Sequence, residues 1–145
     1  MDLDNPVIRL CADGMQAEQE GRAAEARALF DRAWAIRASD YDGCVAAHYV
    51  ARHQDTEEEA LRWNEEALQL AERVGDDRIA GFLPSLLLNL GRSCEVLGDL
   101  ARARACYDRA AGYLHHVPDD AYGRVVRDAI ARVRRPAPPT DDTTA

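Results

Sequence analysis

Apolar residues recur along this chain at helical spacing, in pairs of short stripes that are separated by breaks. One stripe consists of Leu87, Leu90, Gly91 and Cys94, and the next consists of Ala103, Tyr107 and Ala110. The break between them is the segment Leu97-Gly98-Asp99. Spacings of three and four residues place side chains on one face of an α-helix. These residues therefore predict two amphipathic helices that meet at a tight turn, which is a helical hairpin.

The same order of small and aromatic residues occurs three times. The copy that starts at Gly91 continues with Gly98, Ala103, Tyr107 and Ala110. The copy that starts at Gly14 continues with Gly21, Ala26, Phe30 and Ala33, and the copy that starts at His48 continues with Asp55, Ala60, Asn64 and Ala67. Gly14 and His48 are 34 residues apart, and His48 and Gly91 are 43 apart, which is one period plus an insertion of nine. A 34-residue period of paired helices is a known signature of a repeat protein.

This pattern resembles the tetratricopeptide repeat (TPR) family over roughly residues 5–111. The resemblance implies an all-α fold, namely a right-handed α-solenoid of three TPR hairpins plus a C-terminal capping helix. We expect repeats at about 7–40, 41–75 and 84–117 and a capping helix at about 119–134, all in a single domain of residues 1–135. The second copy departs from the family pattern, because His48 replaces a small residue and Asn64 replaces an aromatic one. This departure indicates either local packing or a site there.

Capping residues predict where several helices begin. Asn5 followed by Pro6 is typical of a helix start, as is Ser39 or Asp40, and Thr56 followed three residues later by Glu59 has the spacing of a capping box. The second helix is expected to run to about residue 38 and the third to about residue 53. The helix of the third hairpin that contains Tyr107 is expected to continue to residue 115 or 116.

The insertion at residues 77–83 is apolar enough to form an extra helical turn or two. Pro84 follows it and lacks an amide hydrogen, so we expect either a kink in one long helix or a new helix start there. The last helix has an apolar face, with Arg124, Arg127, Arg132 and Arg134 opposite, and is expected to cover the end of the stack. Residues 136–145 are rich in proline and polar residues and are expected to be disordered.

Charge and composition narrow the range of functions. The chain has 145 residues, all 18 of its basic residues are arginine, and its net charge is −8. A negative charge of this size disfavours nucleic acids and anionic membranes as partners. The chain has neither an apolar run long enough to span a membrane nor an apolar signal core at its start, so we expect a cytoplasmic protein.

The sequence lacks the patterns that indicate catalysis or a cofactor. His48 and His53 are five residues apart and so lie on different faces of a helix, unlike a metal-binding pair at a spacing of four. The four cysteines form no Cys-x-x-Cys motif, and there is no Walker loop or glycine-rich dinucleotide turn. We therefore expect no catalytic, cofactor-binding or metal-binding residues, and a protein that is not an enzyme.

A binding groove is the better-supported expectation. In a TPR stack the first helix of each hairpin lines a concave surface. Helical phase predicts that the groove is lined by Met15, Gln19, Tyr49, Arg52, His53, Leu88, Arg92 and Glu95. A guanidinium can hold a carboxylate by two parallel hydrogen bonds, so Arg52 and Arg92 favour a protein or peptide partner with an acidic group or a free C-terminus.

These observations give one leading hypothesis and two alternatives. The leading hypothesis is a non-catalytic protein-interaction module, an adaptor or scaffold, that binds a peptide or a partner helix in the groove. The first alternative is a self-associating structural protein, a homodimer formed through Ile79, Phe82 and Leu83. The second is a sensor that holds a small molecule or a signal peptide in the same groove.

Overall fold

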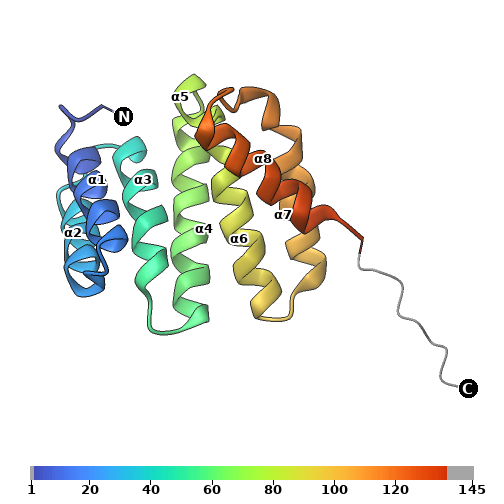
Figure 1. Ribbon diagram of the computed structural model, residues 1–145, viewed down its shortest axis with the longest axis horizontal. Helices are drawn as coiled ribbons and strands as arrows, with labels where there is room; N and C mark the ends of the chain where they lie inside the picture. The colour runs from blue at the N-terminus through green and yellow to red at the C-terminus, as the bar shows by residue number, and fades with distance from the viewer. Residues whose placement is uncertain (1, 137–145) are drawn as a thin grey trace, which may run out of the picture.

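The computed structural model describes residues 2–136, and every regular element in that range is a helix (Figure 1). The α-helices are α1 (Pro6–Gln19), α2 (Ala23–Ala35), α3 (Asp40–Val50), α4 (Glu57–Val74), α5 (Asp77–Ala80), α6 (Leu83–Val96), α7 (Leu100–Gly112) and α8 (Ala121–Arg134). Two short 3-10 helices, η1 (Ala51–His53) and η2 (Leu114–His116), follow α3 and α7. The prediction of an all-α fold is confirmed for these residues.

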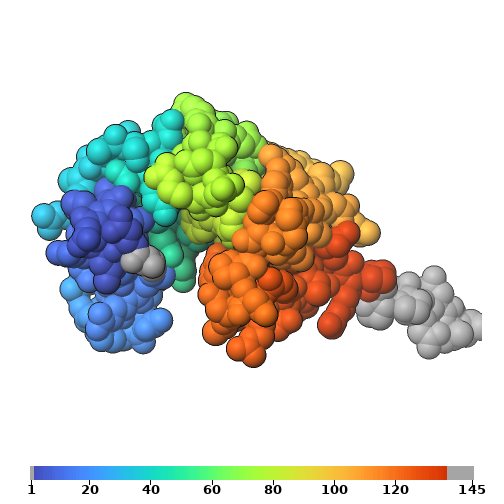
Figure 2. All heavy atoms as spheres, turned by 90° about the horizontal axis from the view of Figure 1, so that it is seen from above, coloured from blue at the N-terminus to red at the C-terminus, as the bar shows by residue number. Residues whose placement is uncertain are grey.

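The long helices pack as consecutive hairpins. The most extensive contacts join α1 to α2, α3 to α4 and α6 to α7. Further contacts join α2 to α3 and α4 to α6, so the three pairs lie side by side in chain order (Figure 1). The last helix, α8, crosses α6 and α7 at a slant (Figure 1). Seen from above, the molecule is an arc with a hollow between the N-terminal hairpin and the C-terminal helices (Figure 2).

Glycine and an aromatic ring allow close helix contact in the first and third hairpins. A Cβ atom added to Gly14 would lie 2.3 Å from Phe30 Cε1, and one added to Gly91 would lie 2.4 Å from Tyr107 Cε1. Both separations are far below van der Waals contact, so only glycine fits beneath these rings. The predicted pairing of small and aromatic residues therefore exists in both hairpins.

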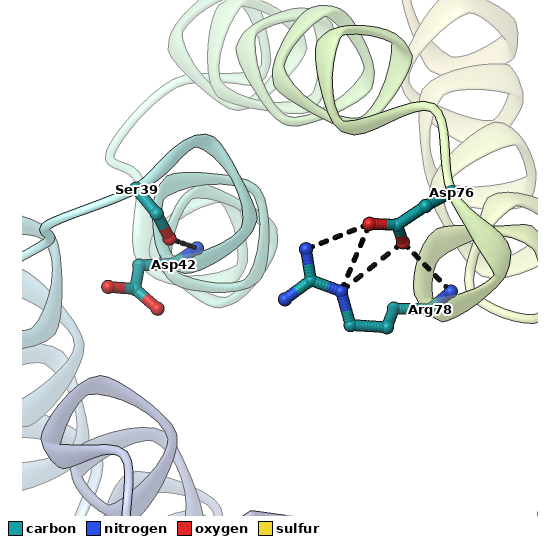
Figure 3. Close-up of polar contacts among 4 residues, drawn as sticks. All are labelled: Ser39, Asp42, Asp76 and Arg78. Atoms are coloured by element: carbon teal, nitrogen blue, oxygen red, sulfur yellow. Dashed lines mark hydrogen bonds and ion pairs between the residues drawn. The ribbon is translucent and has the colours of Figure 1, made fainter.

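The predicted capping residues begin the helices as expected. Asn5 Oδ1 accepts a hydrogen bond from the Val7 amide at 2.9 Å, and Thr56 Oγ1 accepts one from the Glu59 amide at 3.2 Å. Ser39 Oγ accepts one from the Asp42 amide at 3.1 Å (Figure 3). Each bond satisfies a backbone amide that has no partner inside its own helix.

The insertion starts close to the N-terminus of α3 (Figure 3). Asp76 caps α5, because its Oδ1 atom accepts a hydrogen bond from the Arg78 amide at 3.0 Å. The guanidinium of Arg78 donates back to the same carboxylate, with Nη2 2.9 Å from Oδ2, and also lies over the ring of Tyr41. The insertion is therefore a capped helical turn, as the sequence predicted.

A buried carboxylate joins the N-terminal segment to α3. Asp42, which points away from Arg78 in Figure 3, accepts hydrogen bonds from Asn5 Nδ2 at 2.7 Å and from the Ala38 amide at 3.0 Å. The Ala38 amide thus donates to a side chain of α3, that of Asp42, and not to a carbonyl of α2. This contact gives a reason why α2 ends at Ala35 and not near residue 38, where we expected its end.

Two other helix boundaries differ from the prediction, and the structure decides between the two alternatives at Pro84. The chain is α-helical only to Val50 and Gly112, and it then tightens into η1 and η2 before reaching the predicted ends. At the insertion, Pro84 lies in the first turn of a new helix, so the alternative of one kinked helix is wrong. Proline is tolerated there because the first amides of a helix have no internal partner.

Buried side chains form three connected clusters along the arc. The cluster between α3, α4 and α6 contains Ile79 and Leu83, so the apolar insertion is part of the core. Among residues 2–136, none of the helices has both the length and the apolar character that a membrane crossing requires. The tail predicted to be disordered, apart from Pro136, lies outside the described residues.

Candidate functional site

A pocket of about 710 Å³ lies between α3, the start of α4, α6 and α8. Residues from four separate segments of the chain meet there. Its lining is His48, Ala51, Arg52, Gln54, Thr56, Glu57, Ala60, Asn64, Ser85, Leu88, Asn89, Arg92, Ser93, Tyr122, Val125, Val126, Ala129 and Arg132. The pocket has the size of sites that take a drug-sized molecule or a few residues of a peptide, roughly 300–1,000 Å³.

The inner part of the lining is a cluster of polar side chains, which we call the polar floor: His48, Asn64, Asn89 and Ser93. Three of them are buried, with 7%, 6% and 6% of the surface of His48, Asn64 and Ser93 exposed. Asn64 Nδ2 donates to Ser93 Oγ at 3.0 Å, and Asn89 Nδ2 lies 3.3 Å from His48 Nδ1. Asn89 and Ser93 are one turn apart on α6, so this helix is bonded to both helices of the middle hairpin.

His48 is held as a neutral imidazole. Burial, and to a smaller extent the nearby Arg52 guanidinium, lower the pKa of His48 from 6.5 to about 4. The ring packs edge-on against Tyr49 and Phe82, with ring centroids 4.9 Å apart in both cases. At neutral pH this side chain therefore contributes hydrogen bonding and packing to the floor, and no charge.

Charged groups stand at the rim of the pocket. Three are cationic, Arg52, Arg92 and Arg132, and one, Glu57, is anionic. Arg52 Nη2 lies 3.3 Å from Glu18 Oε2, whereas Arg92 and Arg132 form no ion pair with any residue in the range 2–136. The rim thus has an excess of positive charge in a protein whose net charge is −8. This arrangement favours an anionic group as the ligand.

One wall of the pocket is apolar and is shared between α6 and α8. Leu88 of α6 is buried, while Tyr122 and Val125 of α8 are 46% and 67% exposed. The hydroxyl of Tyr122 lies 2.5 Å from Ser85 Oγ and so joins the start of α8 to α6. The pocket therefore offers a ligand polar, cationic and apolar contacts together.

Three of the eight predicted groove residues line this pocket: Arg52, Leu88 and Arg92. The other five lie elsewhere. Tyr49 stacks on Phe30 with ring centroids 5.2 Å apart, and His53 Nε2 lies 2.9 Å from Glu18 Oε2, so both belong to the contact between the first two hairpins. Met15 is half-buried on α1, close to this contact, and Gln19 is exposed at the end of α1.

Glu95 is engaged inside its own hairpin. Its Oε2 atom accepts a hydrogen bond from the Tyr107 hydroxyl at 2.7 Å. The helical phase of α6 does not predict this hydrogen bond, because Tyr107 is on α7. Glu95 therefore supports the ring that covers Gly91 and does not line the pocket.

Part of the pocket had a signal in the sequence. His48 and Asn64 are the two departures from the repeat pattern in the second copy, and both lie in the polar floor. By contrast, Tyr122, Val125 and Arg132 were missed, because α8 was expected only to cover the last hairpin. Val126, Ala129 and Ile130 of the expected apolar face are buried, whereas Tyr122 and Val125 are exposed in the pocket lining together with Arg132, so the expected apolar face of α8 is confirmed only in part.

The groups in the pocket are suited to binding through hydrogen bonds and charge. Within residues 2–136 no three histidine, cysteine or acidic side chains come together as a metal site. The four cysteines are buried, and burial raises the pKa of the Cys11 and Cys44 thiols to about 12. These thiols stay protonated at neutral pH and are therefore poor nucleophiles.

No protein-family model, curated protein sequence or solved structure matches this chain significantly. The protein is therefore described by its own fold and by its pocket. It is an all-α chain of packed helical hairpins, with a polar pocket that has a cationic rim.

Proposed function

We propose that this protein is a cytoplasmic, non-catalytic interaction module of the TPR type, which binds a peptide or partner helix in the pocket between α3, α6 and α8. The 34-residue period of the sequence supports the TPR assignment, as does the close contact of glycine with an aromatic ring in two of the three hairpins. Four reduced, buried cysteines support a reducing compartment.

The observation that carries the proposal is the cationic rim above a polar floor. Arg52 and Arg92 come from separate hairpins, and Arg132 comes from α8, yet all three line one pocket. A guanidinium binds a carboxylate through paired, charge-assisted hydrogen bonds. The amide and hydroxyl groups of Asn89 and Ser93 add partners for peptide groups. A segment with an acidic residue or a free C-terminus is therefore the ligand that this chemistry fits best.

The proposal is tested by capture from a native cell extract. We expect the wild-type protein to retain a partner that the double variant Arg52→Ala and Arg92→Ala loses, with the far-UV helical signal unchanged. The matched control is Arg32→Ala with Arg62→Ala, since these two arginines are exposed and lie outside the pocket. Equal capture by the wild type and by the pocket variant would show that the partner binds elsewhere.

A second candidate function is self-association. The structure buries Ile79 and Leu83 and half-buries Phe82, so these side chains offer little surface to another copy. A different apolar patch supports this candidate: Val96 and Leu100, at the turn between α6 and α7, are each 64% exposed, and Leu97 lies between them. A homodimer formed through this turn would leave the pocket accessible, because none of the three residues lines it.

A further inference from the structure

Helix α8 presents one row of side chains to the pocket and another to the hairpins. The row that lines the pocket follows helical spacing and consists of Tyr122, Val125, Ala129 and Arg132. The neighbouring row contains Val126, which also lines the pocket, and Ile130, and both are buried together with Ala129 in the core cluster with α6 and α7. The first row thus contains an exposed aromatic ring and an exposed valine beside an arginine, all facing one hollow.

Hydrogen bonds near both ends of α8 hold this row in position. Asp120 Oδ1 caps the helix by accepting from the Gly123 amide at 2.8 Å, and Arg127 Nη2 donates to the Val117 carbonyl at 2.7 Å. Arg134 Nε donates to Asp108 Oδ1 at 3.0 Å near the other end. Since the helix is anchored at both ends, Val125 and Arg132 form a preorganised surface, which lowers the entropic cost of binding.

We propose that α8 is the second wall of the binding site and that it selects a peptide segment in which an apolar side chain neighbours an acidic one. This inference rests on the proposed function and adds the partner chemistry. The apolar side chain packs against Val125, Tyr122 and Leu88. The carboxylate is held by Arg132 and Arg92, which form no ion pair within the described residues.

Charge complementarity favours this occupant over other apolar segments. A basic amphipathic peptide would bring its cations against three guanidinium groups, and only Glu57 would compensate for them. A wholly apolar segment would cover the rim arginines and leave them without a partner, which is costly. An acidic and apolar pair satisfies both parts of the lining at once.

The test uses a peptide blocked at both ends, acetyl-Ser-Gly-Leu-Glu-Gly-Ser-amide, with two comparison peptides in which Gln replaces Glu or Ser replaces Leu. Binding is followed by amide chemical shifts in the NMR spectrum of the full chain. We expect shifts in α8 and α6, and about tenfold weaker binding of each comparison peptide. Because both ends are blocked, a free C-terminus cannot account for the binding.

Variants of α8 then test whether Val125 and Arg132 contact the peptide. Val125→Asp and Arg132→Ala are each expected to weaken the Leu-Glu peptide by about tenfold or more. Their controls are Val96→Asp, which changes an equally accessible valine away from the pocket, and Arg124→Ala, which changes an exposed arginine of α8 outside the lining. Both controls are expected to bind as the wild type does.

Three results would overturn this inference. One is binding of the peptide with no loss in the α8 variants, and the second is equal binding of all three peptides. The third is the absence of binding of the blocked Leu-Glu peptide, and shifts in α8 on adding N-acetyl-leucine alone would then indicate a small-molecule site. The capture experiment separates this inference from the proposed function. If one of these three results were found, but the double variant Arg52→Ala and Arg92→Ala still lost the captured partner, the proposed function would stand and only the role of α8 would be wrong.

Discussion

At the scale of single residues, Gly91 determines how closely α6 and α7 approach. The ring of Tyr107 occupies the space where a side chain would begin, and its hydroxyl is bound to Glu95. A larger residue at position 91 must therefore displace the ring or separate the helices. Gly14 and Phe30 have the same relation in the first hairpin.

We expect Gly91→Leu to lower the free energy of unfolding by about 1–3 kcal/mol, because it overpacks this contact. Urea unfolding followed by circular dichroism measures the change. The control is Gly112→Ala, since a Cβ at that position meets no atom within 4 Å. If Gly91→Leu were as stable as the wild type, the hairpin could not be as close as described.

His48 has a different role from the glycines at the matching positions. It is a buried base whose pKa is lowered to about 4, mainly by burial. In the unfolded chain the imidazole takes up a proton near pH 6.5, whereas in the folded protein it stays neutral to a much lower pH. Between these values the unfolded state binds more protons, so stability decreases as the pH falls.

We predict that His48 contributes to a loss of stability on the order of 3 kcal/mol as the pH falls from 6.5 to 4. Above pH 6.5 its contribution is constant. The measurement is the pH dependence of urea unfolding for the wild type and for His48→Gln, whose curve should be flatter in this range. An unchanged slope in the variant, or an NMR titration of His48 near pH 6.5, would contradict the prediction.

At the scale of elements, the position of α8 depends on its first turn. Gly123 packs so close to Pro118 that an added Cβ would lie 1.7 Å from the Pro118 carbonyl oxygen. Backbone cannot yield as a flexible side chain does, so any side chain at residue 123 must move the start of the helix. Tyr122 and Val125, and with them the pocket wall, would move too.

We expect Gly123→Ala to loosen the start of α8, with faster amide hydrogen exchange in α8 and a loss of about 1–3 kcal/mol in stability. Exchange in α1 to α4 should stay unchanged, since α8 makes its main contacts with α6 and α7. Asp128→Ala, at an exposed position of the same helix, serves as the control. Protection of α8 equal to that of the wild type would show that this close contact does not hold the helix.

At the scale of the whole molecule, the question is whether two copies meet. The apolar insertion is used inside the core, and Phe82 packs against His48. Phe82→Asp would therefore destabilise the fold and would give no clear result on assembly. The turn between α6 and α7 is the better position to test, because Val96 and Leu100 are exposed there.

If the protein self-associates, we predict that Val96→Asp with Leu100→Asp shifts its mass in light scattering from dimer to monomer. The stability of the monomer should change little, because neither side chain is part of the core. A wild-type protein that remains monomeric at high concentration would exclude this candidate. A dimer that survives both substitutions would place the interface elsewhere.

The sequence by itself determined the helices, the hairpins and their order. Periodicity, capping residues and the pairing of Gly14 with Phe30 and of Gly91 with Tyr107 depend on residues that are near one another in the chain, so they can be predicted without coordinates. The sequence also showed that His48 and Asn64 depart from the repeat, which marked the middle hairpin as a place for packing or a site.

Only the tertiary structure decided which of these side chains share a pocket. The partners of Asn64 and His48 are Ser93 and Asn89, 29 and 41 residues away. Glu95 and His53 do not line the pocket, and Tyr107 and Glu18 bind them across helices. The wall of Tyr122, Val125 and Arg132 depends on the angle at which α8 crosses α6 and α7, and helical phase within one helix does not determine a crossing angle.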